Sequence, residues 1–213
     1  MLSKIKNFYQ KNSTALSIIS FGITGLIASW IITVEKYAIT LNPNHVTMCD
    51  VNPLISCGVV MRTVYSTQIM QGYPNSWLGL MAYPMAIMFG ASLFFVADKS
   101  AKSFDKSYML LGNLFPFLAF LLSCYWLWLQ MWVIHALCVW CLLSAISSTN
   151  IFFVITRRNI LDDNLKFRGS EKIKTWIQKG YFVPFVILWF VLIFCMMYFP
   201  FFGYQYLGIK WLL

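Results

Sequence analysis

The sequence predicts an all-α integral membrane protein, and two observations support this fold class. Hydrophobic residues make up 60% of the chain and charged residues only 11%, and the apolar residues lie in long uninterrupted runs. About 18–20 apolar residues are enough for a helix to cross the hydrocarbon core. Five runs reach this length, at residues 15–34, 76–97, 108–129, 132–155 and 181–202. We therefore expect a four-helix transmembrane bundle followed by a fifth transmembrane helix.

Two of these spans need separate justification. Lysines precede the first span as they would a signal peptide, but its apolar core is too long and no clear small-residue cleavage site follows, so we expect it to remain as an anchor. The third and fourth spans have no obvious boundary, because no Lys, Arg, Asp or Glu occurs between Lys106 and Arg157. One crossing would be far too long, so we expect a tight turn at residues 131–135.

The basic residues predict the orientation of the chain in the membrane. A net charge of +9 would suggest nucleic acid as the partner of a soluble protein. Here, however, thirteen of the sixteen Lys and Arg residues lie in three segments that alternate with the spans, as orientation signals do. These residues are Lys4, Lys6, Lys11, Lys99, Lys102, Lys106, Arg157, Arg158, Lys166, Arg168, Lys172, Lys174 and Lys179. We expect a cytoplasmic N-terminus, an outer C-terminus and no nucleic-acid partner.

This orientation divides the chain into three parts. Residues 1–156 form the four-helix bundle, with residues 35–75 as its outer loop. Residues 157–180 form a basic cytoplasmic loop, which we interpret as an orientation signal in contact with membrane lipid. Residues 181–213 form the fifth span and a short outer tail.

Two cysteine pairs fall on the same outer face. Cys49 and Cys57 lie in the outer loop, and Cys138 and Cys141 lie at the start of the fourth span. That compartment is oxidising, either a bacterial periplasm or extracytoplasmic face or an ER lumen, where disulfides form and persist. We assign the other two cysteines, Cys124 and Cys195, to packing, because free cysteine is commonly buried as a small hydrophobe.

The spacing of the second pair is suited to thiol chemistry. On a helix Cys138 and Cys141 share a face and can close an exchangeable disulfide, and a helix N-terminus favours the reactive thiolate. An incidental C-x-x-C, an ordinary loop disulfide at Cys49 and Cys57, and zinc ligation are the alternatives. A four-cysteine zinc site is a minor one, because two ligands would lie just inside the apolar boundary. We therefore expect no metal.

The outer loop is predicted to contain a short amphipathic helix. Asp50 or Asn52 could cap it, with Pro53 in its first turn. Its apolar face would carry Leu54, Cys57, Met61 and Val64. Such a helix would lie on the outer mouth of the bundle and bring Cys57 within reach of Cys138. Asn75 and Ser76 begin the second span at the same depth, as helix caps or as hydrogen-bond partners of a ligand carbonyl.

Taken together and in order, these residues resemble a known family. Cys49-Asp50, Ser56-Cys57, Asn75-Ser76 and Cys138-x-x-Cys141 are similar to the motifs of the vitamin K epoxide reductase family, in particular its bacterial homologues. The resemblance covers roughly residues 15–155. The disulfide-bond protein B family, which also links thiols to quinones, carries its C-x-x-C early and its loop pair late, so the order here favours the first family.

The resemblance implies a dithiol oxidase of the bacterial cytoplasmic membrane, with a four-helix bundle around a quinone, either ubiquinone or menaquinone. It implies that Cys49 accepts electrons from a partner, that Cys57 passes them to Cys138, and that Cys141 faces the quinone ring. Asn75, beside Ser76, would donate a hydrogen bond to a quinone oxygen. Many bacterial members carry a fused thioredoxin-like domain, whereas this chain ends at Leu213. The implied partner is thus a separate thioredoxin-fold dithiol oxidase of the disulfide-bond protein A (DsbA) type.

One departure from the family and two alternative functions qualify this interpretation. Vertebrate members have a tyrosine where this chain has Ala145, which puts a second hydrogen bond to the quinone, and activity on vitamin K epoxide, in doubt.

One alternative function is a transporter or structural protein with bracing disulfides. Transporters usually bury ionisable residues within their spans, and none falls inside the five predicted here. The other is a vitamin K or quinone reductase whose main product is the hydroquinone.

Overall fold

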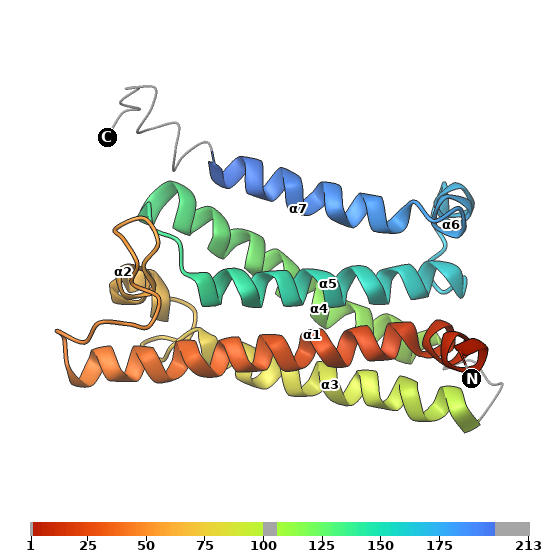
Figure 1. The fold of residues 1–213 in the computed structure, drawn as a ribbon, viewed down its shortest axis with the longest axis horizontal. Coiled ribbons are helices and arrows are strands. Elements are labelled where there is room, and N and C mark those ends of the chain that lie inside the picture. Colours follow the sequence, from red (N-terminus) through yellow and green to blue (C-terminus); the bar gives the residue numbers. More distant parts are fainter. Residues whose placement is uncertain (1, 100–105, 199–213) are drawn as a thin grey trace.

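The computed structural model describes residues 2–99 and 106–198, and within these ranges the chain is helical (Figure 1). Four long helices form a bundle: α1 (Leu2–Leu41), α3 (Ser76–Lys99), α4 (Lys106–Leu129) and α5 (Val139–Leu161). Helix α7 (Phe182–Tyr198) lies along the outside of this bundle, and α6 (Ser170–Gln178) sits at one end. Of β structure, the described part of the chain contains only two isolated bridges. The predicted all-α fold is confirmed.

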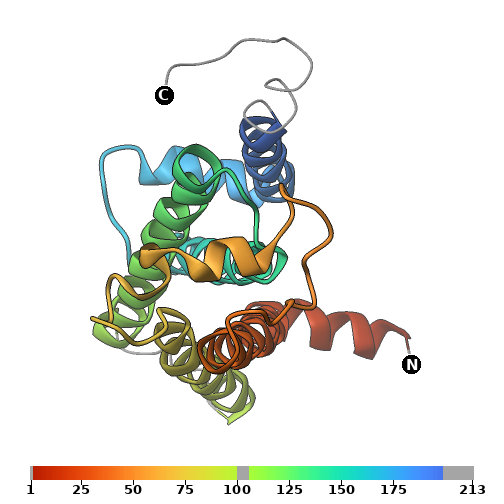
Figure 2. The ribbon, with the colours of Figure 1, turned by 90° about the vertical axis from the view of Figure 1, so that its left-hand side faces the viewer.

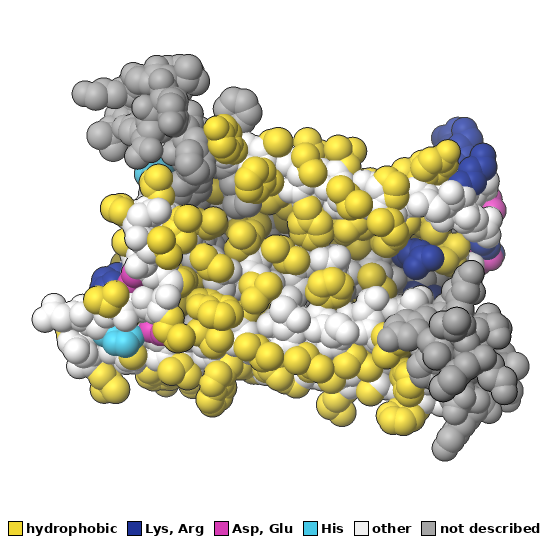
Figure 3. Space-filling model, in the orientation of Figure 1, with side chains coloured by type: hydrophobic (Ala, Val, Ile, Leu, Met, Phe, Trp, Pro, Cys, Tyr) yellow, Lys and Arg dark blue, Asp and Glu magenta, His cyan; other side chains and the backbone are white. Residues whose placement is uncertain are grey.

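Four helical segments are long and apolar enough to cross a membrane: Asn12–Leu41, Ser76–Phe95, Lys106–Ile134 and Val139–Leu161. A fifth crossing is counted if α6 and residues 182–196 of α7, which meet at a bend of 99°, form one broken span. The predicted fifth span, residues 181–202, therefore coincides with α7 up to Tyr198, and its last four residues lie outside the described ranges. Figure 3 shows the apolar side chains as a broad band, with charged groups gathered mainly toward the two ends. The chain is a multi-pass membrane protein.

The first helix extends beyond its predicted end at residue 34. Helix α1 continues to Leu41, so Glu35 and Lys36 lie in its last two turns and the loop begins at residue 42. Both charged groups have partners in that loop. The Glu35 carboxylate bonds His45 Nε2 at 2.8 Å, and Lys36 Nζ donates to the Met61 carbonyl at 2.5 Å. Because α1 extends past residue 34, the candidate span Asn12–Leu41 includes Glu35 and Lys36, which the predicted span did not, and folded loop residues satisfy both charges.

The start of the fourth span also differs from its predicted place. A π-helical turn, η2 (Gln130–Ile134), prolongs α4, and the chain reverses at His135, which has a positive φ of 56°. The chain thus reverses within the predicted turn at residues 131–135, but helix α5 begins only at Val139, so the predicted span start at residue 132 is too early. The reason is that Gln130 closes the turn: its carbonyl accepts the backbone N–H groups of His135 and Ala136.

Close helix packing holds α1 against α3. Gly25 of α1 lies against the ring of Tyr83, and Gly79 of α3 lies against Ser29, so closely that a Cβ at either glycine would overlap its neighbour. Small residues allow helix backbones in membranes to approach in this way. Helix α5 packs against both α1 and α4. The buried core of the bundle is formed by Ala15, Ile18, Tyr83, Leu93, Met109, Ile151 and Ile155.

Helices α3 and α4, in contrast, meet mainly at the end of the bundle near α6. There the Phe89 and Tyr108 rings stack with centroids 5.2 Å apart, and the Tyr108 hydroxyl pairs with Ser92 Oγ at 2.7 Å. Toward the α2 end, α4 runs diagonally away from α3 (Figure 1). The two helices therefore diverge along most of their length.

Helix α7 and the basic segment before it lie outside this arrangement. Trp189 of α7 contacts Phe120 of α4 and Phe153 of α5, with ring centroids 5.7 and 5.9 Å apart. Part of the predicted basic loop is the helix α6, which carries Lys172 and Lys174 and contacts α7 through the rings of Trp176 and Phe185, whose centroids are 5.9 Å apart. Aromatic packing thus attaches the last helix to α4 and α5, while α1 and α3 lie on the other side of the bundle (Figure 2).

Candidate functional site

The loop between α1 and α3 folds over one end of the bundle, where the short helix α2 (Cys57–Arg62) lies across the end of α5 (Figure 2). Ser56 caps this helix, because its Oγ accepts the Val59 N–H at 3.0 Å. The predicted caps, Asp50 and Asn52, are wrong. Asn52 instead accepts the N–H groups of Leu54 and Ile55 and forms a turn before the helix. A side chain that closes a local turn offers the backbone an alternative to starting a helix.

Only part of the predicted apolar face of this helix is buried. Cys57 and Met61 are almost fully buried, whereas Val64 follows the helix and is 78% exposed, and Leu54 precedes it. The buried side of α2 packs with Cys49, Ile39, Ala136 and Cys138. Cys57 is therefore held at the inner side of the loop, facing the start of α5.

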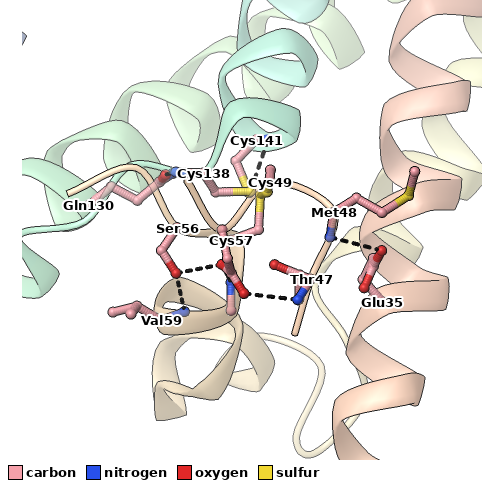
Figure 4. The surroundings of a disulfide bond; sticks show 12 residues. Glu35, Thr47, Met48, Cys49, Ser56, Cys57, Val59, Gln130, Cys138 and Cys141 are labelled. Atoms are coloured by element: carbon pink, nitrogen blue, oxygen red, sulfur yellow. Dashed lines mark hydrogen bonds between the residues drawn. A yellow bond between two sulfur atoms is a disulfide. The ribbon is translucent and has the colours of Figure 1, made fainter. Parts of the chain in front are cut away.

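Three sulfur atoms meet at this point. Cys49 and Cys57 form a disulfide with Cα atoms 5.6 Å apart, and the Sγ atoms of Cys49, Cys57 and Cys138 all lie within 4.8 Å of one another. Figure 4 shows the three side chains converging from the loop and from the N-terminus of α5. The structure thus brings the two predicted pairs together.

A short backbone pairing sets this register. Ile55 and Leu137 form an isolated parallel bridge, in which Ser56 N donates to the Leu137 carbonyl at 3.1 Å and Leu137 N donates to the Leu54 carbonyl at 2.7 Å. In parallel segments, residues that follow paired positions lie beside each other. Ser56 therefore lies beside Cys138, and Cys57 is the next residue, so this pairing brings the two cysteines close together at the start of α5.

Cys138 occupies the N-cap of α5 and is fully buried. Its Sγ accepts the Cys141 backbone N–H at 3.3 Å, as the oxygen of an ordinary cap would. The hydrogen bond from the Cys141 thiol, supported by the backbone N–H groups of Cys141 and Trp140, lowers the pKa of Cys138 despite its burial. The two cysteines were predicted to share a helix face, but Cys138 is instead the cap and Cys141 lies in the first turn. Cys138 is the one whose sulfur is better stabilised as a thiolate.

Gln130 is a site residue that the sequence analysis did not identify. It is 2% exposed, and its Oε1 accepts the Cys138 backbone N–H at 2.8 Å while its Nε2 donates to the Trp126 carbonyl at 3.3 Å. The η2 turn places this amide beneath Cys138 and so fixes the backbone that carries the sulfur. The sequence signal was a single amide residue in an apolar stretch, eight positions before a cysteine.

Asp50 joins the two sides of the disulfide loop. Its carboxylate accepts hydrogen bonds from Thr47 N at 2.8 Å, Ser56 Oγ at 2.6 Å and Gly58 N at 2.9 Å. Burial alone would raise the pKa of Asp50, but the bonds from Ser56, Gly58 and Thr47 together lower this pKa from 3.8 to about 2. A Cβ at Gly58 would lie 2.6 Å from Arg62 Nη1 and 2.7 Å from a carboxylate oxygen of Asp50, so these side chains would have to move to admit one. The loop therefore has a link between its cysteine segments that does not depend on the disulfide.

This link predicts a pH-dependent stability. A lowered carboxyl pKa adds stability that is complete above the unfolded value of about 4 and is lost as the pH falls through the folded value of about 2. We expect Asp50→Asn to lower the thermal unfolding midpoint in detergent by about 2–4 °C from pH 7 to pH 5. The difference from the parent chain should shrink between pH 4 and pH 2. A difference that persists unchanged at pH 2 would show that the carboxylate charge is not its cause.

A cavity of about 800 Å³ lies within the bundle, directly below this sulfur cluster. Helices α1, α3, α4 and α5 form its walls, and residues of α2 and the following turn form its roof. Cys141 is part of the wall. Most of the remaining lining is apolar, which suits a largely apolar ligand with few polar groups.

Asn75 and Ser76, the other two predicted site residues, also line this cavity. Asn75 Oδ1 accepts the N–H groups of Ile69 and Met70, and Nδ2 donates to the Tyr65 carbonyl at 2.7 Å. Tyr65 uses one of the two amide hydrogens, so the other can be directed into the cavity. Ser76 Oγ pairs with Thr33 Oγ1 at 2.7 Å and ties α3 to α1. Hydrogen bonding of either residue to a ligand stays a prediction.

The three clustered sulfurs also have a spacing that could suit a metal ion. Zinc binds thiolates, and Cys49 and Cys57 are bonded to each other. A metal site would therefore require prior reduction of this disulfide. The geometry of the cluster is better suited to thiol–disulfide exchange, in which a thiolate attacks a neighbouring disulfide sulfur.

Comparison with known proteins covers most of the bundle. The model of the vitamin K epoxide reductase family matches residues 16–156, which include all four clustered or cavity-lining cysteines of the site. No curated protein matches the chain. The matched segment begins within α1 and ends within α5, and so contains the cavity and the loop above it.

Proposed function

The chain belongs to the vitamin K epoxide reductase family, and on this premise we propose that it is a membrane dithiol:quinone oxidoreductase. Its substrates would be a dithiol on a separate thioredoxin-fold protein of the DsbA type and a membrane quinone, either ubiquinone or menaquinone. The observation that carries the proposal is the position of Cys138 and Cys141. Cys138 lies within 4.8 Å of the loop sulfurs, and Cys141, in the next turn, lines the cavity.

The first half of the reaction transfers electrons from the partner to the loop pair. A partner thiolate attacks Cys49, which breaks the Cys49–Cys57 bond and releases Cys57 as a thiolate. The second partner thiol then attacks the mixed disulfide, so the partner leaves oxidised and Cys49 becomes a thiol. The partner has lost two electrons and two protons, and the loop pair has gained them. Cys49 itself is 8% exposed, but Met48 and Val51 on either side of it are 81% and 75% exposed and leave room for a docking protein.

The second exchange transfers these electrons within the chain. Cys57 attacks Cys138 of an oxidised Cys138–Cys141 pair, and Cys141 departs as a thiolate. Cys49 then attacks Cys57, which restores the loop disulfide and releases Cys138. The arrangement in the structure, with the loop pair bonded and Cys138 and Cys141 free, corresponds to the product of this step. Gln130 and the N-cap geometry would hold Cys138 in place throughout.

In the last step Cys138 and Cys141 form their disulfide and give up two electrons and two protons, which convert a quinone to the hydroquinone. A quinone is suitable because a partner as oxidising as about −120 mV requires an acceptor of higher potential, and each ~30 mV corresponds to about 1.4 kcal/mol for two electrons. Cys141 would face the quinone ring, and the remaining Asn75 amide hydrogen would be directed at one quinone oxygen.

The divergence of α3 and α4 supports a substrate that enters from the lipid. Several residues line the cavity and are also substantially exposed on the outside of the bundle: Met85, Met88, Leu111, Phe115 and Leu118. All of them lie on α3 or α4. The cavity is therefore open sideways, at a level where hydrocarbon chains would surround the helices.

The distribution of charge supports a location in a bacterial cytoplasmic membrane. The α6 end carries Arg157, Arg158, Lys172 and Lys174, whereas the α2 end carries few basic groups. By the positive-inside rule, the α6 end would face the cytoplasm and contact membrane lipid, and all four cysteines of the site would lie near the outer face. That face is where disulfides form.

The alternative functions predict different observations. A transporter needs ionisable groups along a path through the membrane, whereas Glu35 and Lys36 lie at one helix end and are bound by loop residues. A reductase whose main product is the hydroquinone would use the same sulfurs. It would differ in accepting small dithiols as readily as a thioredoxin-fold partner.

The proposal is tested by mixing the purified protein with a reduced thioredoxin-fold partner and a water-soluble quinone, and following quinone absorbance. We expect one hydroquinone for each partner disulfide formed. Cys124→Ala, which changes a half-buried cysteine of α4 outside the sulfur cluster, should retain the parent rate. Absence of hydroquinone with the parent protein would overturn the proposal, and equal rates with a small dithiol would favour the reductase.

A further inference from the structure

A cluster of hydroxyl groups lines the cavity below Cys141. It consists of Tyr83 on α3, Ser144 and Ser148 on α5 and Ser123 on α4. The Tyr83 hydroxyl lies 2.8 Å from both the carbonyl and the Oγ of Ser144, and the Ser123 and Ser148 hydroxyls pair at 2.7 Å. These groups lie in the central part of the bundle, where polar side chains are costly and often functional.

The position of this cluster relative to Cys141 follows from helix geometry. Ser144 lies three residues after Cys141, so the two share a face of α5 and are separated by about 4.5 Å along the helix axis. Both line the cavity. Tyr83 is 6% exposed and reaches toward Ser144 from α3, although α3 and α5 each pack chiefly on α1. The hydroxyl pair therefore stands one helical turn below the sulfur, in the same cavity.

Resting on the function proposed above, we propose that the Tyr83–Ser144 hydroxyl pair is the hydrogen-bond donor for the second carbonyl oxygen of a para-quinone. The two oxygens of a para-quinone stand at opposite corners of one six-membered ring, a separation comparable with one helical turn of about 5.4 Å. A ring placed with one oxygen near Cys141 and Asn75 would direct the other toward Ser144.

The available hydrogens are sufficient for this role. The Tyr83 hydroxyl has one hydrogen, which it donates to the Ser144 carbonyl. The Ser144 hydroxyl then keeps its own hydrogen, which can point either at Tyr83 Oη or into the cavity. A ligand carbonyl can accept that hydrogen while Tyr83 holds Ser144 in position. Substrates with a carbonyl at both ends of the ring would be favoured over those with one, because only they offer the Ser144 hydroxyl an acceptor in the cavity.

The test uses Tyr83→Phe and Ser144→Ala, each with a matched control. Tyr125→Phe changes a tyrosine of α4 that is not part of the cavity wall and whose hydroxyl donates to Gln68 at an exposed position. Ser147→Ala changes the next serine along α5, which is buried and is not part of the cavity wall. The Ser147 Oγ donates to the Leu143 carbonyl. We expect KM for a soluble para-quinone to rise about fivefold to tenfold in both test variants, with little change in kcat or in either control.

A second readout detects the hydrogen bond itself. In infrared difference spectra with an isotope-labelled quinone, the stretching frequency of one carbonyl should be higher in Ser144→Ala than in the parent and in Ser147→Ala. An unchanged KM and unchanged carbonyl frequencies in folded Ser144→Ala would overturn the inference. The function proposed above would be unaffected by that result, whereas hydroquinone formation by Cys141→Ala would refute the function itself.

Discussion

Replacement of Cys141 by alanine is expected to reduce quinone turnover to less than about 1% of the parent rate, because covalent thiol chemistry is lost with its nucleophile. Cys141 is the cysteine of the pair that lines the cavity. Without it Cys138 has no neighbouring thiol in α5 with which to form a disulfide, so two electrons cannot leave the chain. The measurement is quinone absorbance in the presence of a reduced thioredoxin-fold partner.

The matched control for this variant is Cys124→Ala, since it also removes one sulfur from a helix of the bundle. Its rate should equal that of the parent. Retention of the loop disulfide in Cys141→Ala, measured by mass after thiol alkylation, would show that the fold over the bundle end is intact. Equal turnover in Cys141→Ala and the parent would contradict the role of Cys141.

A chain that retains only Cys57 and Cys138 is expected to form one intramolecular disulfide nearly completely under mild oxidation. The reason is that the Ile55–Leu137 bridge brings together the segments that carry the two residues, and their sulfurs lie within 4.8 Å of each other. The other four cysteines, Cys49, Cys124, Cys141 and Cys195, would be changed to alanine. Peptide mapping without reduction would identify the bond.

The control for this experiment retains Cys57 and Cys141 instead. Cys141 is not part of the three-sulfur cluster and lines the cavity. We expect much slower oxidation of this pair, at least tenfold by the initial rate, which corresponds to about 1.4 kcal/mol. Equal oxidation of the two chains would mean that the loop moves freely over the bundle end, and the proposed order from Cys57 to Cys138 would lose its geometric support.

The fold was predictable to the extent that it depends on the apolar runs and the distribution of charge. The end of α1 was not, because Glu35 and Lys36 look like the boundary of a span in the sequence. Their partners, His45 and Met61, come from a loop whose course the sequence does not show. A charged residue can extend a membrane helix when folded loop residues neutralise it, and this depends on tertiary contacts.

The start of α5 was predicted too early for a related reason. No glycine, proline or charged residue marks the reversal between α4 and α5. The determinant is Gln130, whose carbonyl closes the π-helical turn and whose side chain binds Cys138 N eight residues later. The pattern of apolar and polar residues in the sequence does not distinguish a glutamine that closes a turn, as Gln130 does, from one that faces another helix.

The four cysteines of the site were identified from their order and spacing, and the structure brings them to one end of the bundle. Their individual roles stay predictions. Asp50 was interpreted as a helix cap but joins the loop segments instead, and Tyr83 was not singled out at all. Both depend on contacts between segments distant in the sequence, which a motif cannot contain.

The sideways opening between α3 and α4 has a consequence for how a lipid-soluble substrate is measured. The proposed quinone would partition into the bilayer before it reaches the protein, so the number of quinone molecules per lipid molecule would govern occupancy of the cavity. Dilution of the same proteoliposomes in buffer should then leave the rate per protein unchanged, whereas added empty lipid should lower it once the vesicles fuse. For this protein, the membrane is the solvent in which the substrate concentration is defined.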